Sequence, residues 1–289
     1  MSIATFIPEV WSAELLVALR KSLVYQALSN RDYEGEIAGA GDTVHINSVS
    51  DPTIKTYAKG DTVTYEGLDT VDRTLVIDQS KLFAFAVDDI DKRQAAGNVI
   101  VQAMARSAYR LADLSDQLIA QACVDTNTAN VIAQTSITTG DLAYTGLVSL
   151  NQKLDEANVA KEGRVVVLPP WYLALLFSNA LFTNAFAAGQ PAAQTTGYIR
   201  TILGMDVYES NNTPNSASSA AVSTFVAGNA NVSCVIAGVP SAITFADQLS
   251  EVEALRLQTT VADAVRGLHL YGVKLTRPDS IAVLKASQV

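Results

Sequence analysis

Residues 41–67 read GDTVHINSVSDPTIKTYAKGDTVTYEG, and the way this stretch is buried decides the fold. The run Gly41-Asp42-Thr43-Val44 returns as Gly60-Asp61-Thr62-Val63, and each copy opens a short alternation of apolar and polar residues. Such alternation has the period of a β-strand, and turn residues separate the two runs. We therefore predict a hairpin. A two-stranded hairpin is at best marginally stable alone in water, so this one must lie on another surface.

The composition is that of a globular, acidic protein. Of 289 residues, 49% are hydrophobic, and 29 Asp and Glu against 20 Lys and Arg give a net charge of -9. A protein that grips nucleic acid through its phosphates normally has the opposite excess. Cys123 and Cys234 lie in apolar surroundings and are expected to be buried free thiols of a reducing compartment. No stretch is apolar for long enough to span a membrane, and we expect no signal peptide.

The first half of the chain is expected to hold an arm, strands and one very long helix. Residues 8–29 are predicted as a helix because Trp11 starts a series of apolar residues at helical spacing. Residues 35–88 are predicted to be strand-like. A helix over 89–122 is predicted from the apolar positions Ile100, Met104, Leu111, Leu114, Leu118 and Ala122. A helix of some thirty residues would be roughly 45 Å long.

The second half mixes short helices and strands. Helices are predicted at 141–157 and 171–177, a buried strand at 164–168, and mostly strand over 249–287. Further short strands are predicted at 204–210, 223–228, 233–238 and 242–246, with loops at 187–197 and 211–221. Strands and helices occur in blocks without a βαβ repeat, so the fold class is predicted as α+β.

Residues with catalytic potential are few. His45 and His269 are the only histidines, and neither has a cluster of Cys, Asp or Glu at metal-ligand spacing. Alternation in GLHLYG predicts that His269 lies on a solvated or interface face. The acidic run Asp88-Asp89-Ile90-Asp91 could hold a metal, but it is better interpreted as the N-terminal cap of the long helix. Asp247, Glu251 and Glu253 are expected to be solvated charges. We therefore predict no catalytic, cofactor or metal site.

The order of these segments resembles the major capsid proteins of tailed bacteriophages with the Hong Kong 97 fold. It is most similar to the branch that includes the coat proteins of Salmonella-type short-tailed phages, and the resemblance covers nearly the whole chain. The stretches that carry it are FIPEVWSAELLVALRKSLVYQALSNRDYEGEI (6–37), the GDTVHIN start of the hairpin, GYIRTILGMDVYESN (197–211), VIAGVPSAITFADQLSEVEALR (235–256) and LYGVKLTRPDSIAVL (270–284).

The resemblance implies four structural parts. They are an N-terminal arm (1–35), an extended loop (36–80), a peripheral domain (81–140 and 247–289) with the spine helix 89–122, and an axial domain (141–246). It also implies that subunits form the pentamers and hexamers of an icosahedral head that encloses double-stranded DNA without binding it sequence-specifically. The expected partners are further copies of the chain, a separate scaffolding protein, a portal and cement proteins. The expected location is the virion, after assembly in the bacterial cytoplasm.

The resemblance also implies that the hairpin, which is too thin to bury itself, lies on a neighbouring subunit. The arm can do the same. The residues expected to contact a neighbour are Phe6, Trp11, Val44, Ile46, Ile54, Tyr57, Val63 and Tyr65.

Three other functions remain open at this point. A shell of the same fold could instead be an encapsulin-type nanocompartment that houses a cargo enzyme. A metal-dependent enzyme could use Asp88, Asp89 and Asp91. A surface adhesin or tail component could be built on the strand-rich regions, although a helix of 89–122 argues against it.

Overall fold

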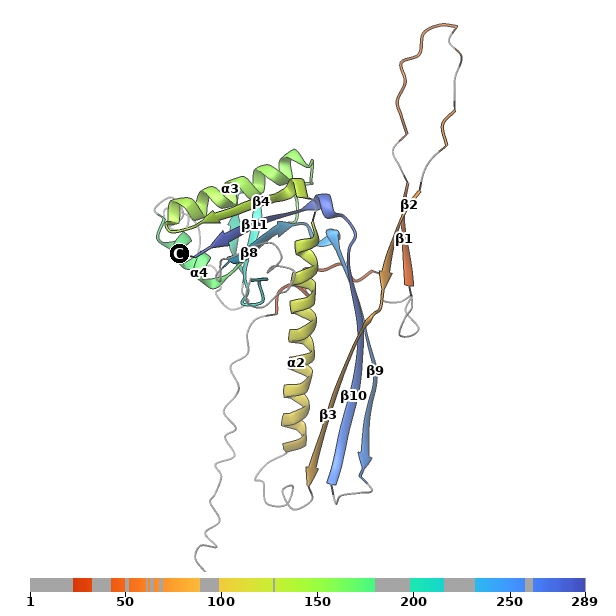
Figure 1. Cartoon of the computed structure of the whole chain (residues 1–289), viewed down its shortest axis with the longest axis vertical. Helices are drawn as coiled ribbons and strands as arrows, with labels where there is room; N and C mark the ends of the chain where they lie inside the picture. Colours follow the sequence, from red (N-terminus) through yellow and green to blue (C-terminus); the bar gives the residue numbers. More distant parts are fainter. Residues whose placement is uncertain are drawn as a thin grey trace, which may run out of the picture.

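A computed structural model describes residues 23–32, 43–49, 52–60, 62, 65–67, 70–88, 99–126, 128–179, 198–215, 232–257 and 262–288. The described strands form a two-stranded, a three-stranded and a six-stranded sheet. In Figure 1 the six-stranded sheet forms a compact upper domain, the three-stranded sheet and a long helix run downward from it, and the two-stranded hairpin projects to one side.

The six-stranded sheet mixes parallel and antiparallel pairs. Two helices, α3 (Gly140–Glu156) and α4 (Pro170–Phe177), pack on it, as predicted for 141–157 and 171–177. The strands, in spatial order, are β4 (Val131–Ser136), β11 (Ile281–Ser287), β8 (Val232–Gly238), β5 (Arg164–Leu168), β7 (Met205–Glu209) and β6 (Tyr198–Ile202). The predicted strands at 164–168, 204–210 and 233–238 are confirmed, whereas 223–228 lies outside the described residues.

This domain has a closed core. Leu147, Leu150 and Leu154 recur along one face of α3 and are fully buried against the sheet. The hydroxyl of Tyr172 on α4 donates a hydrogen bond of 2.7 Å to the carbonyl oxygen of Ala143, which fixes the two helices to each other. The helical period of the leucines is therefore matched by a continuous apolar layer beneath them.

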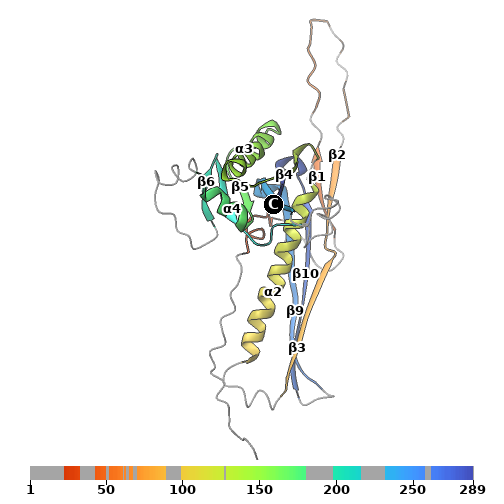
Figure 2. The same ribbon diagram turned by 60° about the vertical axis from the view of Figure 1, so that its left-hand side comes forward.

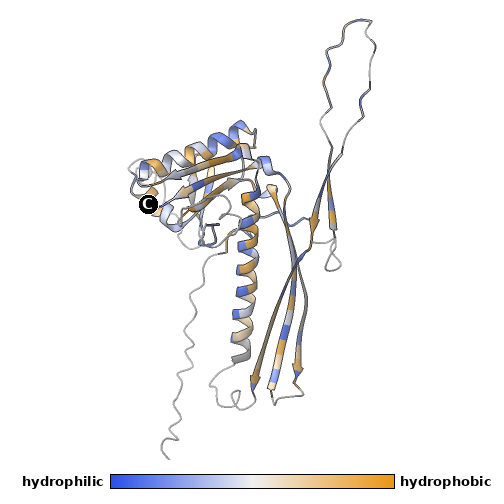
Figure 3. Ribbon diagram, viewed as in Figure 1, coloured by the Kyte–Doolittle hydropathy of each residue, from blue (hydrophilic) through white to orange (hydrophobic). Residues whose placement is uncertain are grey.

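The three-stranded sheet is long and narrow. Its strands are β3 (Gln79–Asp88), β10 (Ala262–Leu275) and β9 (Ile243–Arg256), in that spatial order and antiparallel throughout. The helix α2 (Val99–Ala122) runs along one face of this sheet (Figures 1 and 2). Its 24 residues correspond to roughly 36 Å. Apolar and polar residues alternate along both the helix and the strands (Figure 3).

The long helix is confirmed from Val99 onward, and residues 89–98 lie outside the described part of the chain. Leu111 and Leu118 are half-buried as the predicted apolar stripe requires. Leu114 departs from the prediction because 44% of it is exposed. The helix turns about 100° per residue, which carries Leu114 from the sheet-facing stripe to its margin.

The projecting hairpin pairs β1 (Thr43–Val49) with β2 (Thr70–Val76) in antiparallel register. The predicted partner of the first strand was the Gly60-Asp61-Thr62-Val63 repeat, and this prediction was wrong. Thr62 and residues 65–67 are not strand and belong to the loop between the two strands. Leu75 of β2 is fully buried opposite Val44, so the apolar side of β2 sets the register.

Two further expectations need correction. The helix predicted for 8–29 does not extend to its predicted end, because residues 23–29 form a turn, and residues 1–22 lie outside the described part. The strands β4 and β11, expected to belong with the spine helix, pair with each other and with β8 in the six-stranded sheet. Short 3-10 turns connect the elements at Cys123–Asp125, Thr128–Asn130, Pro240–Ala242 and Pro278–Ser280.

Candidate assembly surfaces

The loop at the tip of the hairpin exposes large apolar side chains. Ile54 is 96% exposed, Tyr65 94% and Tyr57 66%. The backbone N–H of Thr53 donates to the Glu66 carboxylate, which joins the two sides of the loop. The described tip residues lie far from both larger sheets in Figures 1 and 2. This apolar surface is therefore available to another molecule.

The base of the hairpin is anchored to its own subunit. Val44 and Leu75 pack with Ile77, Ala246 and Leu270, which places the hairpin on the face of the three-stranded sheet opposite α2. Ile46 packs against the same cluster. The hairpin is thus fixed at its base, and its tip is left without cover from the described residues.

Residues 23–32 form a strap across the top of α2 and the three-stranded sheet. Val24 and Tyr25 are buried against α2, and the N–H of Gln26 donates to the Asp116 carboxylate at 3.0 Å. Asn30 then bridges to the edge of β9: its N–H donates to the Ile243 carbonyl at 2.8 Å, and its carbonyl accepts from Phe245 N–H at 2.9 Å. The strap therefore connects the helix with the sheet edge.

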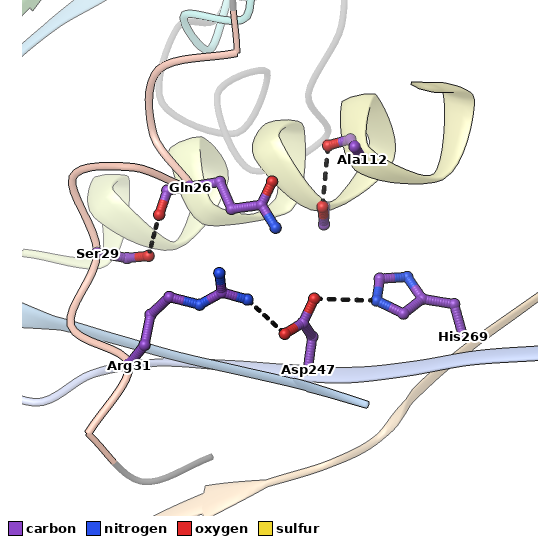
Figure 4. A network of polar contacts seen from close by, with 7 residues as sticks. Gln26, Ser29, Arg31, Ala112, Asp247 and His269 are labelled. Atoms are coloured by element: carbon purple, nitrogen blue, oxygen red, sulfur yellow. Dashed lines mark hydrogen bonds and ion pairs between the residues drawn. The ribbon is translucent and has the colours of Figure 1, made fainter. Parts of the chain in front are cut away.

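A polar network holds the end of the strap (Figure 4). The Arg31 guanidinium pairs with Asp247 Oδ1 at 2.5 Å and lies over the Phe245 ring. The other oxygen, Asp247 Oδ2, lies 3.3 Å from Nε2 of His269. The His269 ring lies 4.9 Å from the Tyr271 ring, centroid to centroid, in a tilted arrangement. His269 is 6% exposed within its own subunit, so the prediction that it lies on a solvated or interface face was wrong. Asp247 is likewise partly buried and paired.

Residues 49–285 match a family described as phage capsid protein. The chain belongs to that family. No curated protein shows a significant match. Among solved structures, a chain from Mycobacterium phage Che8 is 34% identical, with 98% of each chain covered and a TM-score of 0.80. The capsid of cyanophage P-SCSP1u is 19% identical over 97% of this chain and 93% of that one, with a TM-score of 0.77. The mature capsid of bacteriophage PhiM1 is 15% identical over 94% and 89%, with a TM-score of 0.70.

The prediction of a tailed-phage major capsid protein with a mixed helix-and-sheet fold is thereby confirmed. The protein is a major capsid protein that forms the shell of a phage head, and its fold matches those of solved phage capsids. Membership of a capsid family implies a structural role rather than an enzymatic one, and a place in the virion.

The predicted contact residues of the capsid protein fall into three groups. Ile54, Tyr57 and Tyr65 are exposed on the tip. Val44 is buried in its own subunit and Ile46 is partly buried against the same cluster, so both stabilise the hairpin base. Phe6, Trp11 and Val63 lie outside the described residues.

The metal-enzyme alternative gains no support from the described part of the capsid protein. No group of three His, Cys, Asp or Glu side chains there could hold a metal ion. Asp88 is the last residue of β3, while Asp89 and Asp91 lie outside the described residues, so the predicted helix cap is not tested. His45 is exposed and pairs with Asp72 at 2.6 Å.

Both cysteines are free and buried, as predicted. Burial raises the pKa of the Cys234 thiol to about 11, and burial also raises the pKa of Cys123. Such thiols are poor nucleophiles. Among the described helices, none is both long enough and apolar enough for a transmembrane span.

The structure contains a buried acidic pair on α2 that was not predicted from the sequence. Asp113 and Asp116 are almost completely buried, and the Asn212 amide donates to both, at 3.1 Å and 2.7 Å. Burial raises the pKa of Asp116, although its hydrogen bonds from Asn212 and from the strap act in the opposite direction. One sequence signal was present, since two carboxylates three residues apart share a helix face.

Proposed function

We propose that this capsid protein forms the pentamers and hexamers of an icosahedral head around double-stranded DNA, and that the hairpin tip lies on a neighbouring subunit. The observation that carries the proposal is the exposure of Ile54, Tyr57 and Tyr65 on a loop that projects from its own subunit. Covering a large apolar side chain contributes about 1.5–3 kcal/mol. Closed symmetry repeats the contact at every subunit, so modest interfaces add up to a stable shell.

The proposed division of the subunit follows the four parts named above, with one change. The order of the six-stranded sheet supports assigning β4 and β11 to the axial domain with residues 141–246. The N-terminal arm (1–35) then includes the strap, and the peripheral domain keeps α2 with the three-stranded sheet.

The proposed partners are further copies of the chain, a separate scaffolding protein, a portal and cement proteins. We propose assembly in the bacterial cytoplasm before the DNA enters. The net charge of -9 supports weak, sequence-independent contact with the genome, because an acidic shell repels most of the phosphate surface.

Replacing residues 50–69 by Asn-Gly tests the role of the tip. This change keeps β1, β2 and the anchored base and supplies a two-residue turn that suits a hairpin. We expect a folded subunit with unchanged urea unfolding that no longer forms closed particles in sedimentation and negative-stain images.

A second variant keeps the loop and replaces only its three apolar side chains, as Ile54→Ser, Tyr57→Ser and Tyr65→Ser. It should show the same loss of assembly if apolar burial drives the contact. Normal shells from the loop replacement would refute the role of the tip, and normal shells from the triple-serine variant would refute the role of its apolar side chains. DNA inside native particles supports a phage head, and an enzyme cargo in its place would indicate a nanocompartment.

A further inference from the structure

The exposed charges of α2 differ from the charge of the whole protein. Arg106 and Arg110 are exposed, with 79% of the Arg110 side chain accessible. The carboxylates of the described part of the helix are Asp113 and Asp116, and both are buried. Asp113 Oδ2 lies 3.9 Å from Nη1 of Arg110 and partly balances that guanidinium from below. The charged groups that the described helix exposes to solvent are nevertheless the two arginines, on a chain whose net charge is -9.

This cationic strip continues into a polar recess of about 160 Å³. Arg106 and Arg110 are separated by one helical turn, about 6 Å along the axis, and Gln117 and Gln121 continue along the same flank of α2. The recess is lined by Gln117, Gln121, Asn211, Asn212, Thr213, Pro214 and Asn215. Arginine, glutamine, asparagine and threonine are side chains that commonly contact phosphate oxygens.

The opposite face of the three-stranded sheet has a different character. There Glu253 is accessible and is paired with Arg266, and the hairpin above it carries the accessible Asp72 paired with His45. Cations on that face are balanced by accessible carboxylates, so it offers a polyanion little net attraction.

We propose that the flank of α2 formed by Arg106, Arg110, Gln117 and Gln121, together with the recess beside it, faces the shell interior and contacts the phosphate backbone of the packaged DNA. The inference rests on the proposed function, which places DNA inside the shell, and adds which face of the subunit meets it. One guanidinium group can donate two hydrogen bonds to one phosphate, and such contacts do not depend on the base sequence. Two such contacts bind DNA weakly in one subunit, but every subunit of the shell repeats them.

The test measures binding of a short fluorescein-labelled DNA duplex of arbitrary sequence to unassembled full-length subunits, by anisotropy over a tenfold range of NaCl concentration. Two neutralised phosphates predict a slope of log affinity against log salt near -1.8, which is about a 60-fold loss over that range. The variant Arg106→Gln/Arg110→Gln should reduce the slope toward zero.

The matched control is Lys161→Gln/Lys274→Gln, which removes the same charge from two other exposed positions. It should keep the wild-type slope. Absence of measurable wild-type binding at the lowest salt, or an equal change in both variants, would overturn the inference. So would an Arg106→Gln/Arg110→Gln variant that binds DNA normally but fails to assemble, since the face would then meet a protein. Wild-type subunits that never form shells, even when the scaffolding protein is added, would instead contradict the proposed function.

Discussion

The six-stranded and three-stranded sheets differ in how completely their own chain covers them. The central strands β5, β8 and β11 are buried at nearly every residue. Along β3 every second residue through Ala86 is exposed, and Leu82 is 65% exposed. The first sheet is closed within one subunit, whereas the second, with its hairpin, has apolar surface that the described residues leave uncovered. Substitutions in the first should lower subunit stability, and substitutions in the second should affect assembly.

The largest effect on stability is expected for Leu150→Ala. This side chain is fully buried beneath α3, so its removal leaves a cavity and should lower the free energy of unfolding by about 2–5 kcal/mol. Urea denaturation of the unassembled subunit measures it. Leu82→Ala is the matched control in the other sheet and should change the value by less than about 0.5 kcal/mol. Equal losses in both variants would contradict the contrast between the two sheets.

A smaller loss is expected for Arg164→Ala, at the start of β5. Its side chain is 2% exposed, pairs with Asp155 at 2.8 Å, and donates to Asn151 and to the carbonyl oxygens of Val159 and Ala160. Removing it leaves these acceptors without their donor and should cost about 2–3 kcal/mol.

The charge-preserving Arg164→Lys variant serves as the control for this site. It should recover only part of the stability in the same urea titration, because lysine lacks the planar fork. Full recovery would show that charge alone matters there.

The sequence predicted the closed domain better than the open one, for a physical reason. Leu147, Leu150 and Leu154 repeat with the period of a helix because a single apolar layer lies beneath α3. Residues 165–168 of the strand are all apolar because they lie between covered faces. In such elements the local pattern and the tertiary environment agree, so periodicity is sufficient.

The predictions that were wrong concern residues whose surroundings come from distant parts of the chain. His269 alternates with Leu268 and Leu270, and this alternation alone predicted that one face of the strand meets solvent or an interface. In the structure the leucines face the hairpin while His269 faces Asp247 and the strap. The register of the hairpin similarly depends on the burial of Leu75. Leu75 is buried in a cluster that includes Leu270, which is distant in the sequence. No local pattern contains that information.

The raised pKa of the buried Asp116 carboxylate predicts a pH dependence of stability with a defined sign. Its folded-state pKa is raised by burial, so its contribution to stability is complete below the ordinary carboxyl pKa and is lost as the pH rises through the raised value. Asp116→Asn removes this titration but also weakens the bond to Asn212. The destabilisation by Asp116→Asn should therefore be largest in acid and smaller at neutral pH. Urea titrations at several pH values measure it, and a difference that grows with pH would contradict the assignment.

The smallest change in global stability is expected for Arg31→Ala. This variant tests most directly whether the strap and the closed six-stranded domain unfold separately. The Arg31 side chain is 43% exposed, and solvent screening limits an ion pair of this kind to about 0.5 kcal/mol or less of global stability. Its local effect should be larger, because Arg31 follows directly after Asn30, whose two backbone bonds join the strap to β9. Hydrogen exchange at the Asn30 and Phe245 amides should accelerate while the amides of β5 keep their protection. Lys161→Ala, far from the strap, should leave both unchanged. Equally accelerated hydrogen exchange at the amides of β5 and β9 would mean that the strap and the closed domain unfold as one unit. It would contradict the division of the subunit into a self-sufficient part and a part completed by assembly.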